Sequence, residues 1–158
     1  MSFVTTRRSA LLLPAALLLK GCASAPPPAP PTTLDLMIKA GPDQNPDPTG
    51  QPAPVQIQIF QLASSGAFST ADFFALSNQP AATLGQDLIA TESYVVAPGG
   101  SQEVAHGLMA ATQFLGVAVQ FRDIDHAMWR QVVPITAHTV NKLQLATAKL
   151  SVTLAPAS

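Results

Sequence analysis

The sequence is poor in cysteine, in charge and in aromatic residues, and each scarcity excludes a class of protein. One cysteine among 158 residues allows no internal disulfide framework and no cysteine-rich zinc site. Only 11% of the residues are charged and the formal net charge is −1, which argues against a nucleic-acid-binding surface. A hydrophobic content of 47% is too high for a disordered chain. At this length we expect a single folded domain.

Motifs for catalysis and for metal binding are equally scarce. The histidines, His106, His126 and His138, are widely separated and form no metal-ligand spacing. The sequence has no Gly-x-Ser-x-Gly elbow and no phosphate-binding loop with its lysine. We therefore expect no enzyme, no cofactor and no metal, and we expect His106 to be a strand residue with a hydrogen-bond partner.

An acidic segment, residues 122–126, follows the clearest predicted strand. It lacks the further oxygens, the glycine and the terminal glutamate of a calcium loop. The segment predicts a polar turn in which Asp123 or Asp125 hydrogen-bonds to the backbone and Arg122 or Arg130 pairs across it.

The N-terminus has the pattern of an export signal. Arg7 and Arg8 precede an apolar run, residues 9–19, that is too short to span a bilayer. The following Leu19-Lys20-Gly21-Cys22 resembles a bacterial lipobox, although Lys20 stands where a small or apolar residue is usual. The resemblance implies a signal peptide over 1–21 and an acylated Cys22. The alternative is a free exported thiol after ordinary cleavage.

Two consequences follow for the mature chain. Ala23 follows the cysteine, and by resemblance to lipoprotein sorting rules it favours the outer membrane. Loss of Arg7, Arg8 and Lys20 leaves five basic residues against nine acidic ones, so the mature net charge is −4. An acidic body disfavours direct adsorption to anionic lipid.

Ten of the 15 prolines fall in two groups. The first follows Cys22 and predicts an extended, proline-rich tether over residues 22–32. The second lies in residues 41–54, which cannot form a central strand because proline removes ladder donors. A loop of this length in a compact domain is often functional, although a passive, proline-stiffened connection is the alternative.

The rest of the chain, residues 33–156, alternates between apolar and polar residues and predicts about eight short strands, as in a β-sandwich. They cover 34–40, 55–59, 93–97, 104–108, 115–121, 129–136, 143–147 and 150–154. Pro98-Gly99-Gly100 predicts one turn, and a change of apolar phase predicts another near 147–149.

Residues 69–88 break the alternation and predict one or two short helices beside the sandwich. Ser69 and Asp72 form a weak capping box, and Pro80 suits the first turn of a second helix. We expect Phe73, Phe74 and Leu76 to close the end of the core.

The mature sequence resembles the TssJ family, the outer-membrane lipoproteins of bacterial type VI secretion systems. The order and spacing of several short motifs carry the resemblance. They are Cys22, Asn45-Pro46-Asp47 with Gly50, residues 54–62 (PVQIQIFQL), Phe68, Ala71-Asp72-Phe73 with Leu76, Leu84-Gly85 with Asp87-Leu88, Pro98-Gly99, and residues 121–125 (FRDID) with Trp129-Arg130.

The resemblance implies an all-β, transthyretin-like β-sandwich with added helical elements, anchored in the outer membrane and facing the periplasm. It implies binding to the periplasmic C-terminal region of the inner-membrane protein TssM, in a complex that also contains TssL. The family's partner loop corresponds to residues 41–54, with contacts expected from Asp43, Gln44, Asn45, Pro46, Asp47, Pro48 and Gly50. Two alternatives are a lipid-anchored sandwich that binds glycan, peptide or copper, and a periplasmic enzyme or inhibitor on a similar scaffold.

Overall fold

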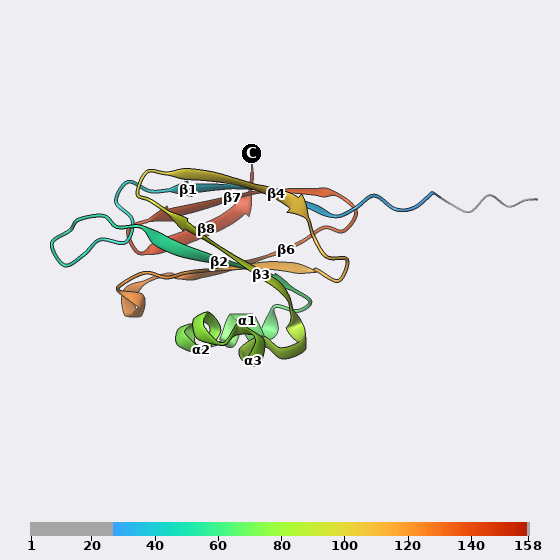
Figure 1. The fold of residues 1–158 in the computed structure, drawn as a ribbon, viewed down its shortest axis with the longest axis horizontal. Coiled ribbons are helices and arrows are strands. Elements are labelled where there is room, and N and C mark those ends of the chain that lie inside the picture. The colour runs from blue at the N-terminus through green and yellow to red at the C-terminus, as the bar shows by residue number, and fades with distance from the viewer. Residues whose placement is uncertain (1–26, 158) are drawn as a thin grey trace, which may run out of the picture.

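The computed structural model describes residues 27–157 and contains two four-stranded sheets packed face to face (Figure 1). The strand orders are β4-β1-β7-β8 and β3-β2-β5-β6. The strands are β1 (Thr33–Ala40), β2 (Val55–Leu62), β3 (Leu88–Val96), β4 (Ser101–Gly107), β5 (Phe114–Val119), β6 (Arg130–Pro134), β7 (Val140–Ala148) and β8 (Ser151–Pro156). The prediction of an all-β, transthyretin-like sandwich of eight strands is confirmed.

The pairing of the strands gives the sandwich two distinct ends. Neighbouring strands are antiparallel except β1 and β7, which run parallel from Thr33 beside Val140 to Ala40 beside Thr147. One end, the loop end, consists of residues 41–54, 97–100, 120–129 and 149–150. The opposite end, where residues 27–32 enter β1, is the tether end (Figure 1).

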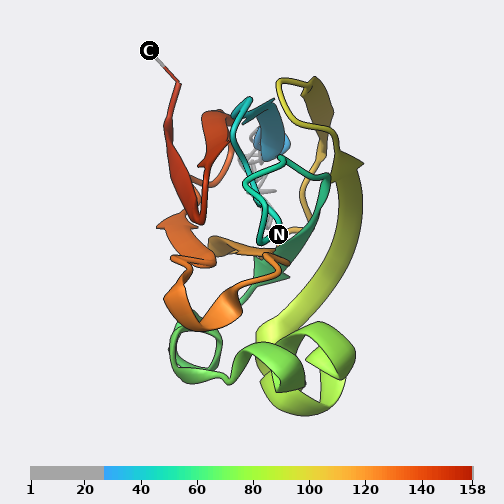
Figure 2. The same ribbon diagram turned by 90° about the vertical axis from the view of Figure 1, so that its left-hand side faces the viewer.

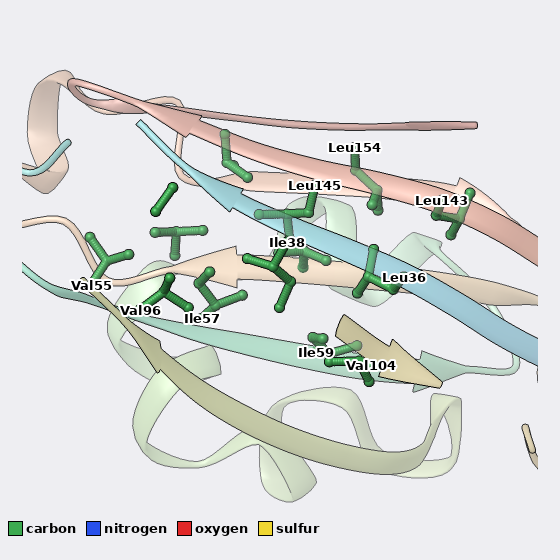
Figure 3. Close-up of a cluster of buried hydrophobic side chains, with 14 of the residues drawn as sticks. Leu36, Ile38, Val55, Ile57, Ile59, Val96, Val104, Leu143, Leu145 and Leu154 are labelled. Carbon is green, nitrogen blue, oxygen red and sulfur yellow. The ribbon is translucent and has the colours of Figure 1, made fainter. Parts of the chain in front are cut away.

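Alternating side chains fill the space between the sheets (Figure 3). Leu36 and Ile38 of β1 face Ile57 and Ile59 of β2, and all four are fully buried. This alternation is what the sequence predicted for half-buried strands.

The helices form a third layer on the outer face of the β3-β2-β5-β6 sheet (Figure 2). They are α1 (Gly66–Thr70), α2 (Phe73–Asn78) and α3 (Pro80–Leu84), followed by a 3₁₀ turn at Gly85–Asp87. Their buried residues Phe68, Leu76 and Leu84 pack on Phe60 and on other apolar side chains of that face. The prediction that Phe73, Phe74 and Leu76 close the end of the core is wrong. Leu76 instead covers a sheet face, and Phe74 is 60% exposed.

The predicted turns are confirmed, with one shift in helix capping. Gly99 has φ 71° in the turn between β3 and β4, and Lys149 has φ 45° between β7 and β8. The predicted capping box of Ser69 and Asp72 does not form, because Ser69 lies within α1. Asp72 is itself the N-cap of α2, and its carboxylate accepts hydrogen bonds from the Phe74 and Ala75 amides. Pro80 is the first residue of α3, as expected.

Candidate partner-binding loop

Residues 41–54 project from the loop end, away from the point at which residues 27–32 leave the sandwich (Figures 1 and 2). The segment has no strand, in agreement with its prolines. Its base is fastened to the other connections of the loop end by two buried amide side chains, Gln44 and Asn45, which are 0% and 3% exposed.

Gln44 joins the loop to both sheets. Its Nε2 donates to the carbonyl of Val96 at the end of β3, at 2.8 Å. Its Oε1 accepts a hydrogen bond from the hydroxyl of Thr147 in β7. A buried amide with both ends paired carries no unsatisfied polar group and holds one geometry.

Asn45 makes a second set of contacts from a left-handed backbone conformation, with φ 48°. Its Nδ2 donates to the Pro54 carbonyl at 2.9 Å, which ties the start of the loop to its finish. Its Oδ1 accepts from the Arg122 amide at 2.8 Å, and its own amide donates to the Lys149 carbonyl at 2.7 Å. The loop base is therefore locked to the β5–β6 and β7–β8 connections.

The loop tip, residues 47–51, is organised by Asp47. Its Oδ1 accepts from the Thr49 amide, the Thr49 hydroxyl and the Gln51 amide, at 2.8, 2.7 and 2.9 Å. These hydrogen bonds lower the pKa of Asp47 below its ordinary value, and the bond from the Thr49 hydroxyl has the largest effect. Gly50 has φ 85°, a backbone region that glycine reaches without strain.

The structure divides the seven predicted contact residues into two groups. Asp43, Pro48 and Gly50 are exposed, and Pro46 and Asp47 are half-buried at the surface. Gln44 and Asn45 are interior, so their side chains do not reach solvent.

A surface hollow of about 510 Å³ lies beside the loop, lined by Pro46, Asp47, Pro48, Arg122, Asp123 and Leu150. The last three residues were missed as members of the site. They come from the β5–β6 and β7–β8 connections, and the sequence carries no signal that these turns meet the loop.

Residues 122–126 do form a polar turn, with a 3₁₀ turn at Ile124–His126. Asp123 pairs with His126 at 2.8 Å, and this contact raises the pKa of His126. The predicted arginine pairing is wrong among the described residues. Arg130 instead donates to the Phe68 and Ala71 carbonyls at 3.2 and 2.8 Å, and it stacks on Trp129.

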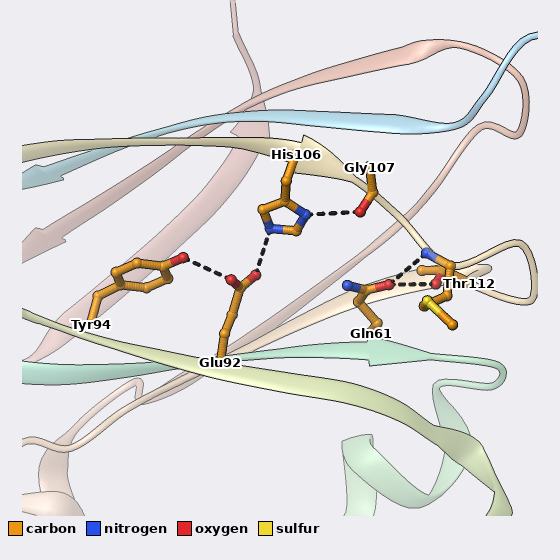
Figure 4. A network of polar contacts seen from close by, with 7 residues as sticks. Gln61, Glu92, Tyr94, His106, Gly107 and Thr112 are labelled. Atoms are coloured by element: carbon orange, nitrogen blue, oxygen red, sulfur yellow. Dashed lines mark hydrogen bonds and ion pairs between the residues drawn. The ribbon is translucent and has the colours of Figure 1, made fainter.

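A second polar cluster bridges the two sheets between β3 and β4, near the tether end (Figure 4). His106 is a strand residue with hydrogen-bond partners, as expected, although the sequence did not say which: Nε2 lies 3.0 Å from Glu92 Oε1, and Nδ1 lies 2.9 Å from the Gly107 carbonyl. Both neighbours are acceptors, so only the imidazolium, with two N–H donors, satisfies both. The Gly107 contact first, then Glu92, raises the pKa of His106. Burial, and next the 2.7 Å bond to Glu92, raises the pKa of Tyr94 to about 12.

Several sequence predictions lie outside the described residues: the signal peptide over 1–21, the acylation of Cys22, the sorting role of Ala23 and the first part of the tether, residues 22–26. Within residues 27–157, no three His, Cys, Asp or Glu side chains converge as metal ligands would. None of the helices in the same range has the length and apolar character that crossing a bilayer requires.

Comparison with known families gives a match over residues 32–154 to the type VI secretion lipoproteins (VasD, EvfM, TssJ, VC_A0113). The chain belongs to the TssJ family. Members of this family are lipoproteins of the type VI secretion membrane complex. No match was found among curated protein sequences.

Solved structures agree with this assignment. The type VI secretion lipoprotein TssJ1 from Pseudomonas aeruginosa is 30% identical, with a TM-score of 0.79 over 82% of this chain and 98% of that one. A chain in a structure described as a type VI membrane complex is 32% identical, with a TM-score of 0.70 over 79% and 98%. A chain in a structure described as the TssM C-terminal domain (869–1107) from EAEC is 30% identical, with a TM-score of 0.67 over 80% and 99%.

Proposed function

We propose that this TssJ-family protein is anchored by lipid in the outer membrane and binds the periplasmic C-terminal region of TssM. In this role it ties a membrane complex that also contains TssL to the outer membrane. The proposal assigns the protein no reaction and no cofactor; it is a structural connector.

The observation that carries the proposal is the likeness to a chain in a structure described as the TssM C-terminal domain. That likeness covers 80% of this chain at 30% identity. The family's loop between the first two strands corresponds to residues 41–54, which join β1 to β2 here. The loop projects from the end opposite to residues 27–32, so an anchored N-terminus and a bound partner would not compete for one surface.

The contacts of the loop support binding without a large ordering cost. The base is held by Gln44 and Asn45, the tip by Asp47, and five prolines stiffen the segment. A surface that is already ordered loses less conformational entropy on association. We propose that the exposed side chains of the loop and the adjoining hollow contact TssM, while Gln44 and Asn45 set the loop's shape.

The anchor can be tested by Cys22→Ser, which removes the acylated thiol. Three acyl chains would hold the wild-type protein stably, because two lipid signals suffice for stable anchoring. We expect the wild type in the membrane pellet with TssM co-purifying, and Cys22→Ser in the soluble periplasmic fraction. Recovery of Cys22→Ser in the pellet at the wild-type level, in cells without TssM, would contradict acylation as the anchor.

Sorting is tested separately by Ala23→Asp, with Ala23→Ser as the matched control. By the lipoprotein sorting rules that this sequence resembles, we expect Ala23→Asp to remain lipidated but to move to the inner-membrane fraction on density-gradient separation. Ala23→Ser should stay in the outer-membrane fraction. An unchanged distribution of Ala23→Asp would contradict the assigned sorting role of this position.

A further inference from the structure

The tether end has a surface without Asp, Glu, Lys or Arg that we call the tether face, residues 30–32, 108–113 and 135–140. Its exposed polar side chains are those of Gln113, Thr136, His138 and Thr139. Met109 and Val140 are 59% and 58% exposed on it. Ala110, Ala111 and Ala137 are also exposed. A shallow hollow of about 260 Å³ lies among them, lined by Pro30, Pro31, Thr32, Leu108, Ala110, Ala137 and His138.

The distribution of charge between the two ends is unequal. Residues 27–32, 108–113 and 135–139 contain no Asp, Glu, Lys or Arg. The nearest charges along β1 and β7, Asp35 and Lys142, are opposite in sign and lie side by side in the sheet. Asp87, just before β3, also lies at this end, with its carbonyl bonded to the Ala63 amide. The loop end, by contrast, carries Asp43, Asp47, Arg122, Asp123, Asp125 and Lys149.

The tether face is also rigid. The Met109 amide donates to Gln61 Oε1 at 3.0 Å, and the Thr112 hydroxyl donates to the same oxygen at 2.9 Å (Figure 4). The entering chain is bonded on both sides: the Thr33 amide donates to the Thr139 carbonyl at 3.0 Å, and the Leu108 amide donates to the Thr32 carbonyl at 2.9 Å. Met109 is therefore displayed by a fixed turn rather than by a free loop.

The entering chain is itself fastened to this face. His138 Nδ1 donates to the Pro30 carbonyl and its amide donates to the Thr32 hydroxyl, both at 2.9 Å. Only seven residues, 23–29, separate Pro30 from Cys22. At about 3.5 Å for each extended residue, Pro30 lies within about 30 Å of Cys22. The free part of the tether is therefore shorter than the predicted segment 22–32, and the tether is attached to the tether face.

We propose that the tether face rests on the lipid surface that holds the acylated N-terminus, with Met109 and Val140 in the interfacial region. The inference rests on the proposed lipidation of Cys22. Removal of exposed apolar area from water favours this contact. The absence of charged side chains avoids their desolvation, and the acidic groups of the loop end are kept away from anionic headgroups. The sandwich then stands on the membrane with its partner loop directed into the periplasm.

The test uses the full-length acylated protein in vesicles of phosphatidylethanolamine and phosphatidylglycerol. The thiol of Cys22 is blocked by its acyl chain, so Met109→Cys supplies the one free thiol for an environment-sensitive fluorophore. Gln51→Cys at the loop tip is the matched control, because Gln51 is equally an exposed loop residue. Part of each vesicle series contains spin-labelled lipid as quencher.

We expect the label at position 109 to shift to the blue and to lose intensity with spin-labelled lipid, at a depth of about 5–10 Å. The label at position 51 should do neither. Adding Val140→Glu should reduce the quenching at position 109 and leave the vesicle-bound fraction and TssM affinity unchanged.

Equal emission and equal quenching at positions 109 and 51, in protein that sediments with the vesicles, would overturn the inference and leave lipid anchoring intact. An unquenched label at position 109, together with a disulfide between unlabelled Met109→Cys copies on addition of an oxidant, would assign the face to a second copy instead. Protein that fails to sediment would overturn the anchoring proposal, and this inference with it.

Discussion

At the scale of single residues, Asn45 shows how a side chain expected at an interface serves the fold. Asparagine in a proline- and aspartate-rich loop predicts an exposed polar contact. Its partners here are backbone groups at Pro54 and Arg122, one of them 77 positions away in the sequence. Gln44 is similar, with partners at Val96 and Thr147. Nothing in the local sequence marks such distant acceptors and donors, so the sequence predicted a long connection here but not the hydrogen bonds that hold it.

Asn45→Ala should destabilise the protein. It leaves the Arg122 amide and the Pro54 carbonyl without their partners, and it places alanine at φ 48°. The expected loss in the free energy of unfolding is about 1–3 kcal/mol, measured by urea titration. Gln51→Ala, at an exposed position whose side chain forms no hydrogen bond within residues 27–157, should stay within about 0.5 kcal/mol of wild type. Equal stability of Asn45→Ala and wild type would contradict the role given to Asn45.

His106 predicts a pH dependence of stability with a definite sign. Its pKa is raised in the folded state, so the imidazolium contacts stabilise the protein fully below the unfolded value of 6.5. That stabilisation is lost as pH rises through the higher folded value. The pair is about a third exposed, so the change should be below about 1 kcal/mol.

The measurement is the free energy of unfolding of wild type and of His106→Gln, from below pH 6.5 to above the raised folded-state pKa of His106. The difference between the two should shrink as pH rises through the raised folded-state pKa of His106. Parallel curves for wild type and His106→Gln would show that the bridge does not depend on the charge of His106.

At the scale of elements, alternation predicted the strands well because most of them bury one face. It failed on β2, whose last residues are buried on both faces. The outer face of β2 and β5 carries Phe60, Leu62 and Ala118, apolar side chains that are buried only because another layer covers them. Phe60 and Leu62 are visible in the sequence, but which segment covers them depends on tertiary packing. The helices were therefore predicted to exist but were assigned to the wrong surface.

Gly116 provides a test of that layer. A β-carbon at this position would lie 2.8 Å from Phe68 Cζ and 3.0 Å from Leu62 Cδ1. Gly116→Ala should cost about 1–3 kcal/mol in the free energy of unfolding through overpacking. The cost should be smaller in a Phe68→Leu background. Gly107→Ala, where a β-carbon would meet nothing within 4 Å, is the matched control. The same loss of stability from Gly116→Ala in the wild-type and Phe68→Leu backgrounds would contradict the packing of α1 on β5.

At the scale of the whole molecule, the two ends of one small sandwich differ in charge and in the segments that they carry. The tether end joins the N-terminal segment through a face that has no Asp, Glu, Lys or Arg, while the loop end gathers four connections and most of the exposed charge. The sequence revealed both proline-rich segments, but their position at opposite ends follows only from the strand pairing. This polarity suits a connector between a membrane and a partner.

The partner contact is tested most directly at the exposed loop tip. Deletion of residues 43–50 would also remove Gln44 and Asn45, and would confuse binding with folding. Pro48→Arg combined with Gln51→Arg adds bulk and charge at two exposed tip positions and leaves Gln44, Asn45 and Asp47 in place. Ala111→Arg combined with Gln113→Arg makes the same change at the opposite end.

The decisive measurement is a calorimetric titration of the TssM periplasmic C-terminal domain with the mature chain, kept in solution by Cys22→Ser. We expect the tip variant to lose at least about tenfold in affinity, which is about 1.4 kcal/mol. The opposite-end variant should bind as the wild type does, and all three proteins should have the same circular dichroism spectrum. Wild-type affinity in the folded tip variant would contradict the assignment of residues 41–54 as the partner loop.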